Sequence, residues 1–136
     1  FLGARMVETF NPVKSVVISM FSMTMILLLN SIFASNDIAI YVLSFIVGVI
    51  TFSISAPIQI AIIRAAKGAE KLGSSMNQSA FNMGNASGAY FGGLPMVFGL
   101  GFNYASVVGG VWACIGGVIG IVILYMDKLS KRKKES

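Results

Sequence analysis

Charged residues are confined to short islands between long apolar runs, and this pattern constrains the fold more than any other feature. Only ten Lys or Arg and five Asp or Glu occur among 136 residues. Each apolar run supplies about 20 residues, enough for a helix to cross the hydrocarbon of a bilayer. We therefore predict an all-α integral membrane protein whose residues 15–126 form four transmembrane helices. The predicted spans are residues 15–33, 38–63, 75–98 and 104–126.

The ten basic residues predict how these spans are oriented. All of them lie in residues 1–14, 64–73 and 127–136, whereas the turns at 34–37 and 99–103 contain no Lys or Arg. Loops rich in Lys and Arg mark the cytoplasmic side of a membrane. We therefore expect both termini in the cytoplasm, with residues 1–14 as a cytoplasmic loop and residues 127–136 as a basic cytoplasmic tail.

The third span differs from the others because it carries several side-chain amides and no charge. Asn77, Gln78, Asn82 and Asn85 fall in one broad arc at the 100° per residue of an α-helix. Two interpretations fit them: the amides line a polar substrate cavity, or they hydrogen-bond across helices and hold the bundle together. Gln59, which follows a proline in the second span, is a further cavity candidate. Its alternative is an amide that reaches toward the membrane interface.

Glycines four residues apart predict where helices approach one another closely. Gly84, Gly88 and Gly92 stack along one side of the third span, and Gly116 and Gly120 form a similar pair in the fourth span. Small residues at this spacing let two backbones come together in lipid. We therefore expect these five glycines to pack against neighbouring helices.

Several classes of function are disfavoured by what the sequence lacks. The chain contains no His and a single Cys, so no metal-ligand cluster is expected. No ionisable residue lies in the middle of a span, and no phosphate-binding glycine loop or nucleophile constellation is present. The basic residues are explained by topology, so no nucleic-acid partner is expected. We expect neither an enzyme nor a cofactor.

Three stretches of the chain match motifs of one family of carriers. The first is GARMVETFNPVK, in which Gly3, Arg5 and Lys14 fit a cytoplasmic loop motif and Glu8 stands where Asp is usual. The second is APIQIAIIRAAKGAEKLGSS, and the third, NQSAFNMGNASGAYFGG, is the most specific. Together they resemble the major facilitator superfamily, specifically its drug and sugar efflux branch, the arabinose-efflux-like permeases.

The resemblance implies that the chain is a C-terminal fragment supplying helices nine to twelve of a twelve-helix transporter. That the first residue is Phe1 rather than Met also leads us to expect a longer protein. Such a protein would be a proton-driven efflux carrier of the bacterial inner membrane, working by rocking of two six-helix halves. Its cargo would be a sugar, a nucleoside or a drug. The expected partners are the lipid bilayer, the missing N-terminal helices and this small-molecule substrate.

Two other interpretations remain open at this point. One is a self-contained four-helix transporter of the small multidrug type, which has a similar length but uses a membrane-embedded carboxylate in its first helix. The first span here has none. The other is a non-transporting scaffold or assembly subunit, which would explain the glycine spacing but neither the amides nor the loop motif.

Overall fold

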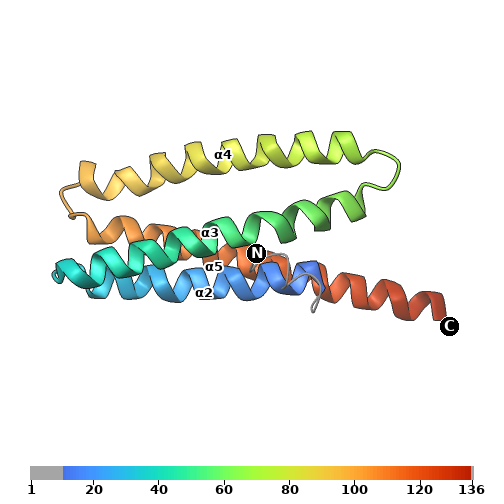
Figure 1. Cartoon of the computed structure of the whole chain (residues 1–136), viewed down its shortest axis with the longest axis horizontal. Coiled ribbons are helices and arrows are strands. Elements are labelled where there is room, and N and C mark those ends of the chain that lie inside the picture. The colour runs from blue at the N-terminus through green and yellow to red at the C-terminus, as the bar shows by residue number, and fades with distance from the viewer. Residues whose placement is uncertain (1–10, 136) are drawn as a thin grey trace.

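The computed structural model describes residues 11–135, with side chains as far as residue 130, and this part of the chain is all-helical (Figure 1). The prediction of an all-α protein is therefore confirmed. The four helices, joined by short connections, are α2 (Pro12–Ile32), α3 (Asp37–Ala65), α4 (Glu70–Val97) and α5 (Asn103–Glu135).

Three of the four helices have the length and the composition of a membrane span. These are α2, α3 and the part of α5 from Asn103 to Ser130. Helix α4 has 28 residues, which is long enough, but it does not reach the same apolar character. Its amides, serines and glycines lower its hydropathy. Three of the four predicted spans thus have the length and composition to cross a membrane, and a membrane-spanning α4 stays a prediction.

Side chains at the first turns determine where α2 and α3 begin. The Oδ1 atom of Asn11 accepts a hydrogen bond from the backbone N–H of Val13 at 3.1 Å, and Asn36 does the same for Ala39 at 3.1 Å. Pro12 occupies the first helical position of α2, where a missing N–H has no cost. These caps satisfy backbone donors that no helical carbonyl can reach.

The connections on either side of α4 depend on glycine. Gly68, Gly99 and Gly101 have φ values of 83°, 74° and 86°, a region that residues with a Cβ rarely adopt. The carboxylate of Glu70 accepts a hydrogen bond from the Gly68 N–H at 2.9 Å. Backbone hydrogen bonds from Gly68 and from Glu70 itself lower the pKa of this exposed carboxyl group. Glu70 thereby closes the α3–α4 turn.

The closest helix packing is between α2 and α5. Gly117 and Gly120 are buried there. A Cβ atom on Gly117 would lie 3.1 Å from the ring of Phe21, and one on Gly120 would lie 2.6 Å from Cγ2 of Val17. The hydroxyl of Thr24 also donates across this interface, to a carbonyl of α5 at 3.4 Å. Because glycine has no side chain, Gly117 and Gly120 allow α5 to approach α2 closely, as expected for helices in lipid.

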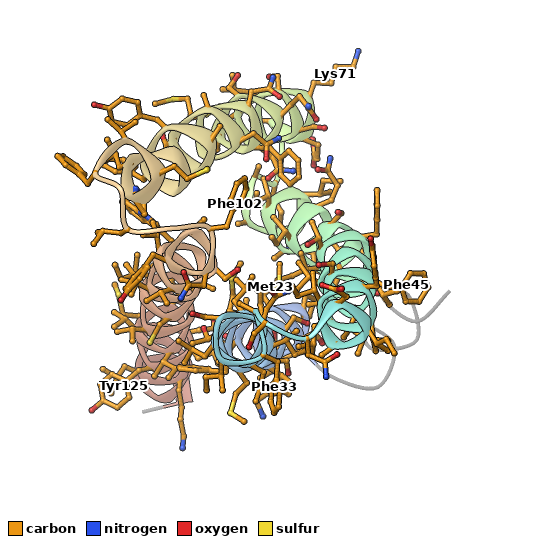
Figure 2. The ribbon with its side chains drawn as sticks, turned by 90° about the vertical axis from the view of Figure 1, so that its left-hand side faces the viewer. Met23, Phe33, Phe45, Lys71, Phe102 and Tyr125 are labelled. Carbon is orange, nitrogen blue, oxygen red and sulfur yellow. The ribbon has the colours of Figure 1, made fainter. Side chains whose placement is uncertain are left out.

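The helices form a ring in which each contacts two neighbours. Helix α2 packs on α3 and α5, and α4 completes the ring through contacts with α3 and α5 (Figure 2).

Helix α4 is held chiefly near its two ends. Near its beginning, an added Cβ on Gly73 would lie 2.7 Å from the Cβ of Ala66. Near its end, Pro95 is buried. All residues from Phe81 to Tyr90 are exposed. The middle of α4 therefore lacks a covering helix within residues 11–135.

The antiparallel order places the basic residues at one end of the bundle. The connections 33–36 and 98–102 lie at the opposite end from the α3–α4 turn and the end of α5 (Figure 1). Arg64 and Lys71 flank that turn and Lys67 lies in it. Lys14 and Lys128 line one hollow at the same end, next to a second hollow lined by Arg64. Which end faces the cytoplasm stays a prediction. Helix α5 continues through most of the segment predicted as a tail, because no helix-breaking residue follows its apolar part.

Filling one of these closed glycine positions should destabilise the protein. We expect Gly117→Leu in the full-length protein to lower the free energy of unfolding by about 1–3 kcal/mol, because the new side chain meets the Phe21 ring. Gly48→Leu is the matched control, since a Cβ at Gly48 meets nothing within 4 Å. Thermal unfolding in detergent would measure both variants. Equal melting temperatures for the two would contradict the close α2–α5 contact.

Candidate functional site: the polar face of α4

A hydrogen-bonded cluster joins α3 to α4 near the basic end of the bundle. The Nε2 atom of Gln59 donates to Oγ of Ser74 at 2.7 Å, and its Oε1 atom accepts a short hydrogen bond from Nδ2 of Asn77. Both amide side chains are partly buried. Gln59 and Asn77, two of the five predicted cavity residues, are therefore in direct contact.

The short α3–α4 connection explains this pairing. The turn at residues 66–69 makes α3 and α4 antiparallel, so residues at similar distances from the turn lie opposite one another. Gln59 and Asn77 satisfy this condition. Buried Pro57 lies half a turn before Gln59, and the close approach of Gly73 to Ala66 holds the two helices together there. In the sequence, counting residues from the predicted turn to Gln59 and to Asn77 would have indicated this contact.

Two hollows adjoin the cluster, and both are lined by Gln59 and Gln78. One, of about 360 Å³, also has Ser55, Asn77 and Phe81 among its walls. The other, of about 660 Å³, opens toward the basic end and is lined mainly by serines of α4. Amides and hydroxyls both donate and accept hydrogen bonds. The pair of hollows can therefore bind neutral polar groups without a charged partner.

The two remaining amides extend this face toward the middle of α4. Gln78, Asn82 and Asn85 are four and three residues apart, a spacing that places them on one side of a helix. All three are exposed, and neither Asn82 nor Asn85 lines the two hollows. The structure thus brings Gln59, Asn77 and Gln78 together and leaves Asn82 and Asn85 one and two turns away. Their role in a substrate cavity stays a prediction.

Lys71 and Phe81 were not among the residues predicted from sequence, yet both line the polar hollows. Lys71 extends outward at the end of α4 (Figure 2). It is the one charged side chain that lines either hollow. Phe81 lies one turn beyond Asn77, which places an aromatic ring beside the amides. The sequence places Phe81 on the same side of the predicted helix as the amides, and this position could have identified it as a lining residue.

The glycines predicted to pack fall into two groups in the structure. Gly116 and Gly120 face α2, and an added Cβ on Gly116 would lie 3.4 Å from the sulfur of Met20. A Cβ at Gly84, Gly88 or Gly92 would meet no atom within 4 Å. These three contact no neighbour closely within residues 11–135, so their packing role stays a prediction.

The open glycine face of α4 looks onto α5 across a shallow, mostly apolar groove of about 360 Å³. Gly84, Gly88 and Gly92 form one wall, and Val108 and Trp112 belong to the other. The ring centroids of Trp112 and Phe91 lie 5.3 Å apart, so the two side chains form an aromatic contact between α5 and α4. Trp112 is a wall residue that the sequence reasoning missed.

The predicted cytoplasmic loop motif is represented here by Lys14 alone. Gly3, Arg5 and Glu8 lie outside the described residues. Lys14 is exposed in the first turn of α2 and lines a hollow shared with the end of α5. Within residues 11–135, no group of three or more His, Cys, Asp or Glu could hold a metal ion.

Comparison with known proteins gives matches to bacterial transporters. The chain is 33% identical over 106 residues to "Putative transporter AraJ" of Escherichia coli K12, which covers 78% of this chain and 27% of that protein. It is 32% identical over 103 residues to "Inner membrane transport protein YdhP" of the same strain, covering 76% and 25%. A "Probable sugar efflux transporter" of Haemophilus influenzae Rd is 33% identical over 113 residues, covering 82% and 28%.

The chain is homologous to bacterial membrane transporters. This relationship confirms the recognition of a transporter from the sequence motifs. The relatives are named as transporters, not as enzymes. Together with three helices that could cross a membrane, they identify a multi-pass protein of the bacterial inner membrane. The chain spans about a quarter of the length of these relatives. No family model matches it, and no solved structure matches it significantly.

A double-mutant cycle would measure the Gln59–Asn77 contact. We expect Gln59→Ala and Asn77→Ala to be coupled by about 0.6 kcal/mol, a typical value for a hydrogen bond between membrane helices. The measurement is the unfolding free energy of the full-length protein and its three variants. Gln59→Ala combined with Asn85→Ala is the control cycle and should show additive effects. Additivity in both cycles would argue against the contact.

Proposed function

We propose that this chain is the C-terminal part of a major facilitator efflux transporter and supplies helices nine to twelve of a twelve-helix fold. The carrier moves a small organic solute across the inner membrane by alternating access. The homology to transporters about four times as long supports this assignment. It favours a longer carrier over a self-contained four-helix protein or an assembly subunit.

The observation that carries the proposal is the exposed polar face of α4. A helix with four amides on one broad arc is costly in contact with lipid, since every unpaired polar group there loses its hydrogen bonds to water. In residues 11–135 no helix covers the middle of this face. The simplest arrangement that satisfies Gln78, Asn82 and Asn85 is a water-filled substrate cavity, completed by helices of the other half.

The lining chemistry favours a solute recognised by hydrogen bonds. Side-chain amides and serine hydroxyls surround the two polar hollows, with Phe81 beside them. Such a surface suits hydroxyl groups and ring heteroatoms and gives no fixed negative charge to hold a cation. A sugar, a nucleoside or a neutral drug fits this description. The sugar efflux name of one relative agrees with the first of these.

Coupling to protons requires a titratable group that these spans do not provide. Between Ser15 and Ile63, and again between Ser74 and Met126, the only ionisable side chain with a carboxyl group is Asp37, which lies at a helix end. Membrane carriers place their proton-binding carboxylates inside the bundle. We therefore assign the proton-binding residue of the antiport cycle to the preceding helices.

Transport by the full-length protein tests the role of the exposed amides. We expect Asn82→Ala and Asn85→Ala each to lower the rate of efflux at subsaturating solute by about fivefold, the effect of losing one net hydrogen bond. Met76→Ala is the control, because Met76 is a 64% exposed residue of α4 that lies on the side of the helix away from the amides. Efflux from vesicles loaded with candidate sugars, nucleosides and drugs is the measurement.

Efflux and melting temperature together distinguish substrate contact from helix packing as the role of Asn82 and Asn85. Substrate contacts predict slower efflux with an unchanged melting temperature in detergent. Unchanged efflux in both amide variants would contradict a cavity role for these residues. If the folded wild-type protein moved no solute of the three classes, the scaffold interpretation would replace the carrier.

A further inference from the structure

At the basic end of the bundle, α2 and α5 border an open hollow of about 480 Å³ that shares no lining residue with the polar hollows of α4. Lys14 of α2 and Lys128 of α5 line it together with Asp127 and Tyr125. Ile121 and Leu124, on the membrane side of these polar residues, complete its apolar wall. Two cations from different helices therefore lie above an apolar surface at the end of two membrane-spanning helices.

The surroundings add to the positive charge of this hollow. A second hollow, of about 460 Å³, lies on the other side of Asp127 and is lined by Arg64 of α3. Lys14, Lys128 and Arg64 thus line two neighbouring hollows that share one carboxylate, that of Asp127. Beyond Lys128 the helix continues unbroken to Glu135.

The position along α5 places this hollow at the membrane surface. The apolar part of α5, residues 104–126, is about 34 Å long at 1.5 Å per residue, close to the roughly 30 Å of bilayer hydrocarbon. Tyr125 points away from the bundle in Figure 2 and is 64% exposed, as expected for an aromatic ring at the lipid headgroups. Lys14 and Lys128 then lie at the depth of the lipid phosphates.

We propose that the Lys14–Lys128 hollow binds the headgroup of an anionic phospholipid. The phosphate accepts hydrogen bonds from the two lysine ammonium groups, and the first part of an acyl chain lies along Ile121 and Leu124. Basic pockets between membrane helices and juxtamembrane clusters of Lys and Arg both bind anionic lipid in this way. This site is independent of the proposed substrate cavity.

Lipid retention by the purified full-length protein tests the site. Native mass spectrometry would count bound phosphatidylglycerol after extraction from vesicles of phosphatidylglycerol and phosphatidylethanolamine. We expect the Lys14→Gln, Lys128→Gln double variant to bind phosphatidylglycerol about fivefold more weakly for each lysine removed. The matched control is Lys67→Gln, Lys71→Gln, which removes two charges at the same end of the bundle but away from this hollow.

Two further comparisons make the result decisive. The charge-conserving variant Lys14→Arg, Lys128→Arg should retain the lipid and thereby show that the glutamine variant fails through lost charge. Added inorganic phosphate at millimolar concentration should not displace the lipid, because it lacks the acyl contact with Ile121 and Leu124. Equal lipid loss in the glutamine and control variants, or displacement by phosphate alone, would overturn the proposal.

Discussion

The close approach of α5 to α2 is the interaction on which the rest of the described structure depends. Lipid supplies no hydrophobic driving force between two apolar helices, so they associate where their surfaces fit. On α5, Gly117 and Gly120 leave room for Phe21 and Val17, and Thr24 adds a hydrogen bond across the interface. Helix α3 then packs on the other side of α2, so that these three apolar helices lie side by side.

Helix α4 differs from the other three helices in its more polar composition and in its fewer contacts, and one explanation accounts for both differences. It is the only one of the four described helices that falls short of a membrane span in apolar character, and its middle is exposed. Its amides and its glycines fall within one broad arc, and the glycines have no close neighbour among the described residues. A helix that borders water and also packs closely against helices of the other half would require both features. The proposed carrier provides these surroundings.

The sequence predicted the helices and their order well because apolar length and charge position are local properties. It predicted less about contacts, since glycine spacing shows where a close approach is possible without naming the partner. Gly116 and Gly120 meet α2, whereas Gly84, Gly88 and Gly92 meet nothing within the described residues. The Gln59–Asn77 hydrogen bond depends on the register across the α3–α4 turn, and the Lys14–Lys128 hollow joins residues at opposite ends of the sequence. Neither follows from the periodicity of one helix.

Thiol labelling would show whether the polar face of α4 borders water inside the membrane. The background is a full-length protein in which Cys114 is replaced by alanine. One variant carries a cysteine in place of Asn82. The control variant carries a cysteine in place of Phe52 of α3, a side chain that is 85% exposed. A membrane-impermeant maleimide should label the cysteine at position 82, with slower labelling in the presence of a transported solute, and should leave the one at position 52 unlabelled. Absence of labelling at position 82 from both sides of the membrane would contradict the account.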